Sequence, residues 1–245
     1  MTDPAAYLAA AAATWPPASA RRVGPWTIRA GQGGGKRVSA ATAEAPVTAD
    51  DIALAEDAMR ALGQAPLFMV RPGADRLDGL LHPLGYRVVD PVDILACPVH
   101  TLASPPPPIS AFTIWEPLEI MRALWSEAGI GPARQAIMAR APEPKTAVLG
   151  RSRDRAAGAA FVAIHRGIAV THALVVAPGQ RRQGTAVNMM RAAACWAQDH
   201  GAGALCVLVT RANAPARALY ASLGMKIVGH YHYLEKGTQE AGAVG

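Results

Sequence analysis

Apolar residues in this chain follow two periods that alternate along its length. Short runs rich in Val, Leu, Ile and Ala predict buried strands, whereas segments with apolar residues at helical spacing predict helices. The predicted strands cover residues 26–30, 37–43, 67–70, 86–95, 147–151, 157–165, 169–176, 204–209 and 226–234. The predicted helices cover residues 4–14, 49–62, 74–84, parts of 117–140, 185–200 and 215–223. Helices that alternate with strands indicate an α/β fold.

An unbroken proline run, Pro105–Pro108, interrupts this alternation. Proline lacks a backbone N–H and has a fixed φ, so the run favours a stiff extended connector over a helix or a central strand. We therefore expect a first domain over residues 1–104, a Pro-rich linker over 105–110 and a second domain over 111–237. Residues 238–245 are expected to form a flexible tail.

The end of each predicted domain carries a similar pattern. Leu84-Gly85-Tyr86 aligns with Leu223-Gly224-Met225 at an offset of 139, the distance from Gly85 to Gly224, and no gap is needed. The alignment also superposes Val70 on Val209, Val89 on Val228 and Leu95 on Leu234. Each copy has the order strand, loop, helix, Leu-Gly, strand. The pattern favours an internal duplication, although Leu-Gly is also a common way to end a helix.

Composition narrows the class of protein. The net charge of +6 invites a nucleic-acid partner, but Lys and Arg occur in small groups and only three Phe are present, so we expect no nucleic-acid binding. Three cysteines without CxxC spacing argue against disulfides and zinc and favour a reducing, cytoplasmic location.

The N-terminal apolar stretch and a histidine pair each suggest a further role. Ala5–Ala13 precedes a small-residue triplet that resembles a signal-peptide cleavage site, but Asp3 stands where a signal peptide has Lys or Arg. No run reaches 18 apolar residues, so we expect no membrane association. His230 and His232 alternate on one strand without a third ligand, so no metal is expected.

One loop points to an anionic ligand. The apolar strand 173–176 runs into a basic turn, Arg181-Arg182-Gln183-Gly184, and a long helix begins near Thr185. The first turn of a helix offers unpaired N–H groups and a positive dipole end, and Gly184 lets the backbone approach a ligand closely. The pattern alone also fits an ordinary strand-to-helix turn with solvated arginines.

The neighbours of this loop resemble the GNAT superfamily of acetyl-CoA-dependent N-acyltransferases. Four features follow one another as in that family. They are Leu174-Val175-Val176 with Pro178, Arg181-x-x-Gly184-x-Ala186, Val209-x-x-x-Asn213, and Ala218-Leu219-Tyr220-x-x-x-Gly224-Met225. Ala186 departs from the usual last glycine of the loop, and Met225 from the usual Phe. The resemblance is strong over residues 172–233 and weak before residue 147.

The resemblance implies a GNAT fold, with a mixed central sheet flanked by helices, that moves an acetyl group from acetyl-CoA to an amine. The acceptor is expected to be a small-molecule or peptide amine. The residues implied to bind acetyl-CoA are Leu174, Val175, Val176, Arg181, Arg182, Gln183, Gly184, Thr185, Ala186, Asn213, Ala216 and Arg217. An acyl-CoA-binding module without turnover is the alternative function.

The same resemblance implies a catalytic acid and leaves the base open. Tyr220 is expected to protonate the departing thiolate, unless it is only a core aromatic. His172 precedes the cofactor strand and is the leading candidate for the base, on a face shared with Leu174 if the strand alternates regularly. Glu116 and Glu127 are weaker candidates.

The first half lacks these features. The duplication places Leu81 where Tyr220 stands, and no loop like 181–186 precedes it. We therefore expect residues 1–104 to form a smaller, degenerate GNAT-like α/β domain without catalytic activity, which shapes the acceptor site.

Overall fold

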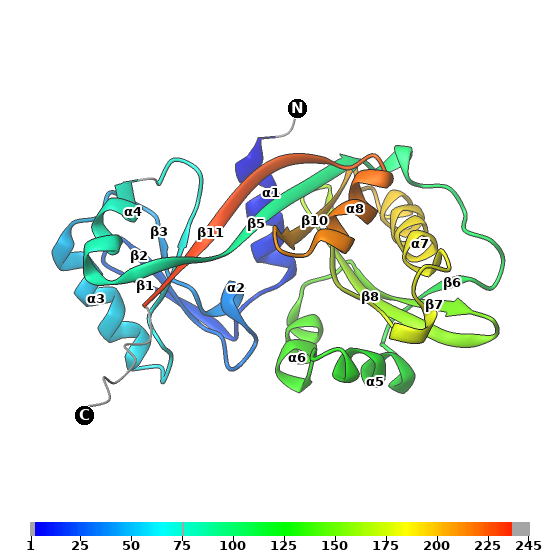
Figure 1. Ribbon diagram of the computed structural model, residues 1–245, viewed down its shortest axis with the longest axis horizontal. Helices are drawn as coiled ribbons and strands as arrows, with labels where there is room; N and C mark the ends of the chain where they lie inside the picture. The colour runs from blue at the N-terminus through cyan, green and yellow to red at the C-terminus, as the bar shows by residue number, and fades with distance from the viewer. Residues whose placement is uncertain (1–2, 75, 237–245) are drawn as a thin grey trace, which may run out of the picture. The chain divides into compact units, whose positions relative to one another are not determined.

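The computed structural model describes residues 3–74 and 76–236 of the chain, which form an α/β fold (Figure 1). The helices are α1 (Pro4–Thr14), α2 (Lys36–Ser39), α3 (Ala49–Arg60), α4 (Arg76–Leu81), α5 (Glu119–Glu127), α6 (Pro132–Arg140), α7 (Thr185–Asp199) and α8 (Ala214–Ser222). The strands are β1 (Ser19–Val23), β2 (Trp26–Ala30), β3 (Thr42–Ala43), β4 (Leu67–Val70), β5 (Tyr86–Pro98), β6 (Ala111–Ile114), β7 (Lys145–Ser152), β8 (Arg155–His165), β9 (Ile168–Val176), β10 (Ala204–Thr210) and β11 (Lys226–Lys236). Short 3-10 turns are η1 (His82–Leu84), η2 (Val99–Thr101) and η3 (Pro178–Gln180).

The main sheet has eight strands in the order β4-β11-β5-β10-β9-β8-β7-β6, and a second sheet has the order β1-β2-β3. β9 and β10 run parallel, whereas β6, β7, β8 and β9 pair antiparallel along the chain. The sheet is therefore mixed, which confirms the expected fold class.

The chain divides into two compact units, and each is described by itself. The larger unit holds residues 3–16 and 93–229 of the described chain. In it, Ala160, Val162 and Ile164 of β8 pack in one apolar cluster with Met189 of α7. Phe161 points to the opposite face, where it contacts the ring of Trp15. Helix α7 thus covers one face of the sheet, and α5 and α6 lie on the other (Figure 1).

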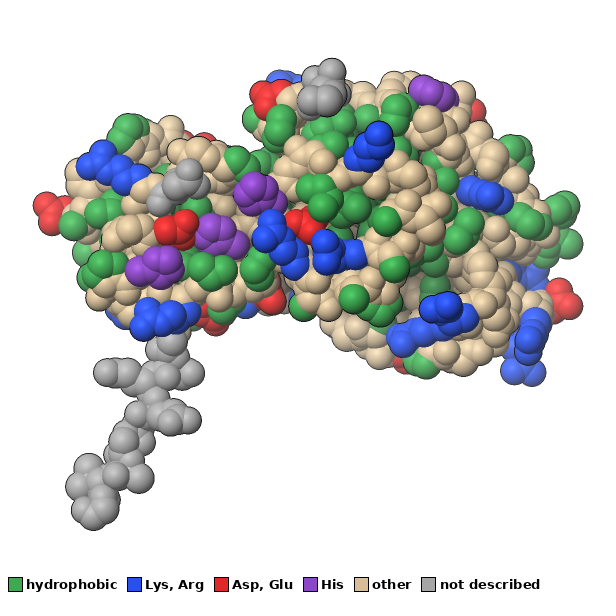
Figure 2. All heavy atoms as spheres, turned by 45° about the horizontal axis from the view of Figure 1, so that its top comes forward, with side chains coloured by type: hydrophobic (Ala, Val, Ile, Leu, Met, Phe, Trp, Pro, Cys, Tyr) green, Lys and Arg blue, Asp and Glu red, His purple; other side chains and the backbone are tan. Residues whose placement is uncertain are grey.

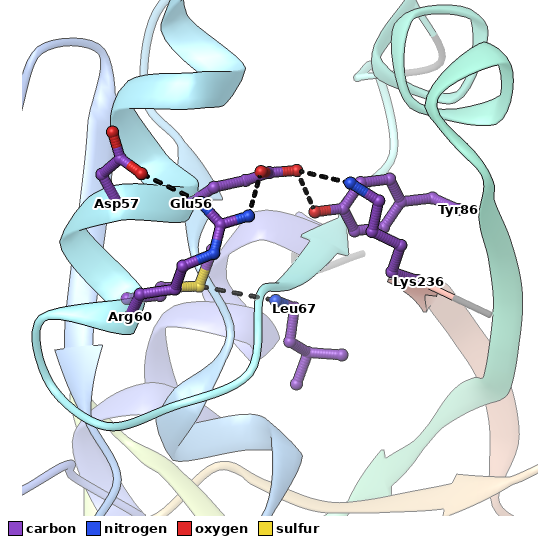
Figure 3. A network of polar contacts seen from close by, with 7 residues as sticks. Glu56, Asp57, Arg60, Leu67, Tyr86 and Lys236 are labelled. Carbon is purple, nitrogen blue, oxygen red and sulfur yellow. Dashed lines mark hydrogen bonds and ion pairs between the residues drawn. The ribbon is translucent and has the colours of Figure 1, made fainter. Parts of the chain in front are cut away.

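The smaller unit holds residues 17–92 and 230–236 of the described chain. Its core includes Trp26, Phe68 and Tyr86, whose rings contact one another in series. The Tyr86 hydroxyl donates a 2.6 Å hydrogen bond to Glu56, which Arg60 and Lys236 also contact (Figure 3). Burial and this carboxylate raise the pKa of Tyr86, so the phenol stays a donor. The network fixes α3 against β5 in this unit.

The elements of the two halves follow the repeat seen in the sequence. β4, α4 with η1, and β5 correspond to β10, α8 and β11, and Gly85 follows η1 as Gly224 follows α8, with φ of +86° and +77°. Such positive φ values explain why glycine recurs there, since it adopts them without steric cost.

The last strand of each copy pairs with the other copy. β11 begins in the larger unit and ends in the smaller one, where His232 lies opposite Val70 of β4. With the offset of 139, His232 corresponds to Asp93 and Val70 corresponds to Val209. The repeat therefore predicts that Asp93 lies opposite Val209. Six residues after Asp93 and six residues before Val209, just beyond the ends of β5 and β10, the Val99 N–H donates to the Gly203 carbonyl. This hydrogen bond has the spacing that the β4–β11 register predicts for β5 and β10 after the offset of 139.

Several local predictions differ from the structure. Residues 37–43 do not form one strand, because Gly35, with φ of +94°, introduces α2, and only Thr42–Ala43 is extended as β3. The structure also contains β1 and β6, for which no strand was predicted. The predicted helix 74–84 is divided between α4 and η1.

The compact units also divide the chain differently from the expected domains. Helix α1 belongs to the larger unit, because it packs on β8 and β9. Pro105–Pro108 forms neither helix nor strand and lies within the larger unit. The expected tail 238–245 lies outside the described residues. Among the described helices, none is long and apolar enough to cross a membrane.

Candidate functional site

The parallel strands β9 and β10 separate part of the way along their length. Their pairing runs from Ile168 and Ala204 to Thr171 and Val207, and both strands continue beyond it, to Val176 and Thr210. On its other side β9 remains paired with β8, with Val175 opposite Ala159 and Val176 opposite Gly158. The edge of β9 over Leu174–Val176 is therefore not paired with β10 and is open to a ligand, although the Val176 carbonyl accepts from the Arg181 side chain.

The loop after β9 ends at the N-terminus of α7. Gly184 is the N-cap, with φ of +79°, and nothing lies within 4 Å of a Cβ built on it. Arg182 is exposed, and the Nε of Arg181 donates to the Val176 carbonyl at 3.2 Å. Gln183 accepts a hydrogen bond from Ser152, and Thr185 is buried, so its side chain is not available to a ligand. The first-turn N–H groups of α7 have no carbonyl one turn earlier in the helix, so they can bind an anion.

Two glycines let α7 pack closely on the sheet beside this loop. A Cβ on Gly150 of β7 would lie 2.4 Å from the Met189 sulfur of α7. A Cβ on Gly158 of β8 would lie 2.5 Å from the Val175 carbonyl oxygen and 2.9 Å from the same sulfur. The sulfur ends a flexible side chain, whereas the carbonyl belongs to the backbone of β9.

Replacing Gly158 by alanine is therefore expected to lower the free energy of unfolding by about 1–3 kcal/mol, as overpacking does elsewhere. Gly203→Ala is a matched control, because nothing lies within 4 Å of its added Cβ. Urea denaturation of both variants measures the difference. Equal stability of Gly158→Ala and the control would contradict the close packing.

Tyr220 lies on α8 and is 8% exposed. It belongs to the apolar cluster of α7 and β10, against which Leu174 of β9 packs. Burial in these surroundings raises the pKa of Tyr220 to about 12. Its hydroxyl hydrogen-bonds none of the residues that the structure describes. The side chain is thus a protonated phenol whose donor is not used by residues 3–74 or 76–236.

This raised pKa predicts a loss of stability at alkaline pH. The folded-state pKa lies above the value of about 10 for an exposed phenol, so the stabilisation is complete below pH 10 and is lost as the pH rises through 12. At pH 11 the loss amounts to about 1–1.5 kcal/mol. Urea unfolding of wild type and Tyr220→Phe at pH 8 and pH 11 should show a larger loss in wild type. Equal losses would mean that the phenol ionises as an exposed one does.

His172 is buried on the face of the sheet that packs against α1. Its Nε2 lies 2.8 Å from the Thr14 hydroxyl, and its ring contacts those of Trp15 and Phe161. Regular alternation fails directly after it, because Ala173 has φ of +51° and the register with β8 shifts there. This β-bulge removes the premise on which His172 was expected to share a face with Leu174. The Ala173 carbonyl accepts a 2.8 Å hydrogen bond from the Trp125 indole of α5.

The start of α8 lies at the other side of the separated strands. The Asn213 side chain caps the helix by accepting from the Ala216 N–H at 3.2 Å. Arg217 and Arg211 both contact the Asp93 carboxylate of β5, at 3.3 and 2.8 Å. Asp93 is only 2% exposed. Its buried carboxylate holds both arginines close to the C-terminal end of β10.

Some residues of this region had no signal in the sequence. Asp93, Trp125 and Thr14 are far along the chain from their partners, and only the fold brings each pair together. Glu116 and Glu127, the weaker base candidates, are exposed.

The histidines of β11 lie in the smaller unit. His230 is exposed, and the Nε2 of His232 lies 2.8 Å from an Asp78 oxygen. Within residues 3–74 and 76–236, no three His, Cys, Asp or Glu side chains come together as a metal site.

On the face shown in Figure 2, the coloured Lys and Arg side chains lie in small separate groups.

Comparison with known proteins agrees with the family that the sequence resembles. Residues 112–225 match the acetyltransferase (GNAT) family. The chain is 26% identical over 235 residues to the uncharacterized N-acetyltransferase YobR of Bacillus subtilis (strain 168), covering 91% of this chain and 94% of that protein. A GCN5-related N-acetyltransferase from Kribbella flavida has the same fold, with a TM-score of 0.71, 19% identity and 95% coverage of both chains.

A two-copy protein also shares the fold. The tandem GNAT protein from the clavulanic acid biosynthesis pathway aligns with a TM-score of 0.57 and 16% identity, over 81% of this chain and 75% of that one. The family expected from the loop and its neighbours is therefore the one that residues 112–225 of this chain match, the acetyltransferase (GNAT) family.

Proposed function

We propose that the larger unit transfers an acetyl group from acetyl-CoA to an amine of a small molecule or peptide. The observation that carries this proposal is the separation of β9 from β10 after Thr171 and Val207. It leaves the Leu174–Val176 edge unpaired directly before a loop that can bind an anion. An extended amide-containing chain can hydrogen-bond such an edge as an added strand does, and the pantetheine of coenzyme A is a chain of this kind.

The residues around the loop fit the pyrophosphate of coenzyme A. The N–H groups of the first turn of α7 and the positive end of its dipole favour phosphate. Gly184 leaves open space where a side chain would otherwise project, and Arg182 adds an exposed positive charge. Asn213 and Ala216 are assigned to the other side of the pantetheine. Arg217 is assigned there too, while its guanidinium remains paired with Asp93. Bound acetyl-CoA supplies the activated thioester.

Tyr220 is assigned as the acid that assists the departing thiolate. A phenol with a pKa of about 12 is a weaker acid than a thiol, whose usual pKa is near 8.5. Complete proton transfer to a free thiolate is therefore uphill by about 5 kcal/mol. Tyr220 thus acts mainly as a hydrogen-bond donor to the negative charge that develops on the sulfur. The amine loses one proton in the reaction, and the thiolate takes up one proton to become the thiol, so the protons balance.

His172 is assigned as the group that accepts the proton of the incoming amine. Neutral imidazole has a pKa near physiological pH, which suits a base that must both take up and release a proton. The hydroxyl of Thr14 and the rings of Trp15 and Phe161 hold its ring in one orientation.

The smaller unit is assigned no catalytic part. Leu81, the residue that the repeat aligns with Tyr220, is fully buried and carries no titratable group. The short helix α2 after Gly33-Gly34-Gly35 has only four residues, and its Lys36 is already paired with Asp90 and Glu235. We therefore keep the interpretation of this half as a degenerate GNAT-like copy.

A test of the function incubates the full chain with acetyl-CoA and a panel of amines, including polyamines, amino acids and peptides. Release of coenzyme A and the mass of acetylated products are measured. Turnover with at least one amine is expected. Tight binding of acetyl-CoA without any turnover would reject the enzyme and favour a non-catalytic acyl-CoA-binding module. A failure to bind acetyl-CoA would reject both.

A further inference from the structure

Helix α1 supplies a buried hydroxyl to the histidine of the proposed site. Thr14 is the last residue of α1 and is 0% exposed, and His172 of β9 is 5% exposed. The two residues lie in the same compact unit, although 158 positions separate them. Thr14 lies outside the segment 112–225 that matches the family, so the family match does not account for this contact.

The two contacts of this hydroxyl determine where its proton lies. The Thr14 Oγ1 is 2.7 Å from the Ala10 carbonyl oxygen and 2.8 Å from His172 Nε2. A carbonyl oxygen cannot donate, and two oxygens at 2.7 Å repel unless a proton lies between them. The single hydroxyl proton of Thr14 is therefore directed to Ala10, and the hydroxyl oxygen can only accept from His172.

It follows that Nε2 of His172 carries a proton in both charge states of the ring. A neutral imidazole has one N–H and one lone pair, so the lone pair lies on Nδ1. A proton that His172 takes up must then bind at Nδ1.

The neighbouring aromatic rings keep the His172 ring from turning over, which would exchange the positions of its two nitrogens. The Trp15 centroid lies 4.9 Å from that of His172, and the Phe161 ring is stacked on it at 6.1 Å. Trp15 follows Thr14 directly, so the end of α1 provides both the hydroxyl and an aromatic wall. Exchange of the two nitrogens would require the ring to turn between these neighbours.

We propose that Thr14 is a positioning residue for the acetyl transfer, because it holds His172 as the Nε2–H tautomer and makes Nδ1 the proton-accepting atom. The inference rests on the proposed function of His172 as the base. It assigns to α1 a direct part in the chemistry of the larger unit.

The tautomer is measured by NMR on the full chain labelled with ¹⁵N-histidine. The His172 signals are identified by their loss in His172→Gln, which is needed because the chain has seven histidines. Wild type is expected to show a protonated Nε2 and an unprotonated Nδ1 at high pH. Thr14→Val removes this acceptor and is expected to lower the share of the Nε2–H tautomer and to lower kcat by about tenfold or more. Thr14→Ser keeps the hydroxyl and is expected to restore the wild-type tautomer and most of the rate.

Thr101→Val is the matched control. Its hydroxyl also donates to a backbone carbonyl, that of Pro98 at 2.7 Å, but it hydrogen-bonds no histidine side chain among the described residues. The control should change neither the tautomer of His172 nor kcat. The wild-type spectrum, assigned with His172→Gln, tests the proton position without any Thr14 variant, so a poorly folded Thr14→Val would not prevent the test.

Three results would overturn the proposal. The first is a proton on Nδ1 of neutral His172 in wild type. The second is an unchanged tautomer in Thr14→Val. The third is a changed tautomer with an unchanged kcat, which would make the hydroxyl structural only. Absence of turnover with every amine, together with the expected tautomer, would instead reject the proposed function and with it the catalytic part of Thr14, while the proton assignment would stand.

Discussion

Tyr220→Phe is expected to lower kcat by roughly 10²–10³-fold and to change the KM for acetyl-CoA little. The phenol contributes to the proposed reaction only as charge develops on the sulfur, so its loss affects the transition state more than the bound ground state. The hydroxyl makes no hydrogen bond to any residue in the described part of the chain, so its removal should leave the fold intact. Steady-state kinetics of coenzyme A release measure both constants.

Tyr7→Phe provides the matched control for this variant. Tyr7 is 6% exposed on α1 in the same unit, so the change removes a hydroxyl from an equally buried ring. It should leave kcat within a factor of two or so of wild type, as expected for a residue outside the proposed site. A Tyr220→Phe enzyme as active as Tyr7→Phe would make Tyr220 a core aromatic and nothing more.

Much of the fold could be predicted because its central elements have strong periodic patterns. α1, β2 and β4 begin and end at the predicted residues, and α7, β9 and β10 differ by one residue at an end. These segments bury an apolar face or both faces, so their hydrophobic pattern reports their structure directly.

The elements that were missed have no such pattern. β1 is an edge strand with four exposed residues, so its sequence, Ser19-Ala20-Arg21-Arg22-Val23, shows no alternation. α2 depends on the backbone conformation of Gly35, and its four residues are too few to display a helical period. The positions of β11 beside β4 and of β5 beside β10 also have no signal in the sequence, because a strand's pattern does not identify its partner.

The candidate site, too, could be predicted only where its residues lie close together in the sequence. The loop 181–186 is local in the chain, so its position before α7 could be predicted from strand, glycine and helix in sequence. The orientation of His172 could not, because the bulge at Ala173 places a non-glycine residue at positive φ, which nothing in the local sequence requires. Contacts of Thr14 with His172 and of Asp93 with Arg217 depend on tertiary packing.

Gly184→Ala is expected to raise the KM and the dissociation constant for acetyl-CoA by roughly tenfold or more. The added methyl group would project into the space that the pyrophosphate needs, and each tenfold loss corresponds to about 1.4 kcal/mol of binding free energy. Apart from Gly184 and its two neighbours in the chain, no described residue has an atom within 4 Å of that methyl group, so the effect on binding would come from the ligand and not from a clash within the protein. Calorimetric titration with coenzyme A and the KM for acetyl-CoA measure it.

Gly201→Ala separates this effect from backbone strain. Gly201 follows α7 at its other end, has the same φ of +79°, and also has nothing within 4 Å of an added Cβ. Both variants should lose about 1 kcal/mol of stability, because alanine is disfavoured at positive φ. Only Gly184→Ala should weaken acetyl-CoA binding. If both variants bound the cofactor equally well, the N-terminus of α7 would not be the phosphate site, and the arginines of the loop would be solvated surface residues.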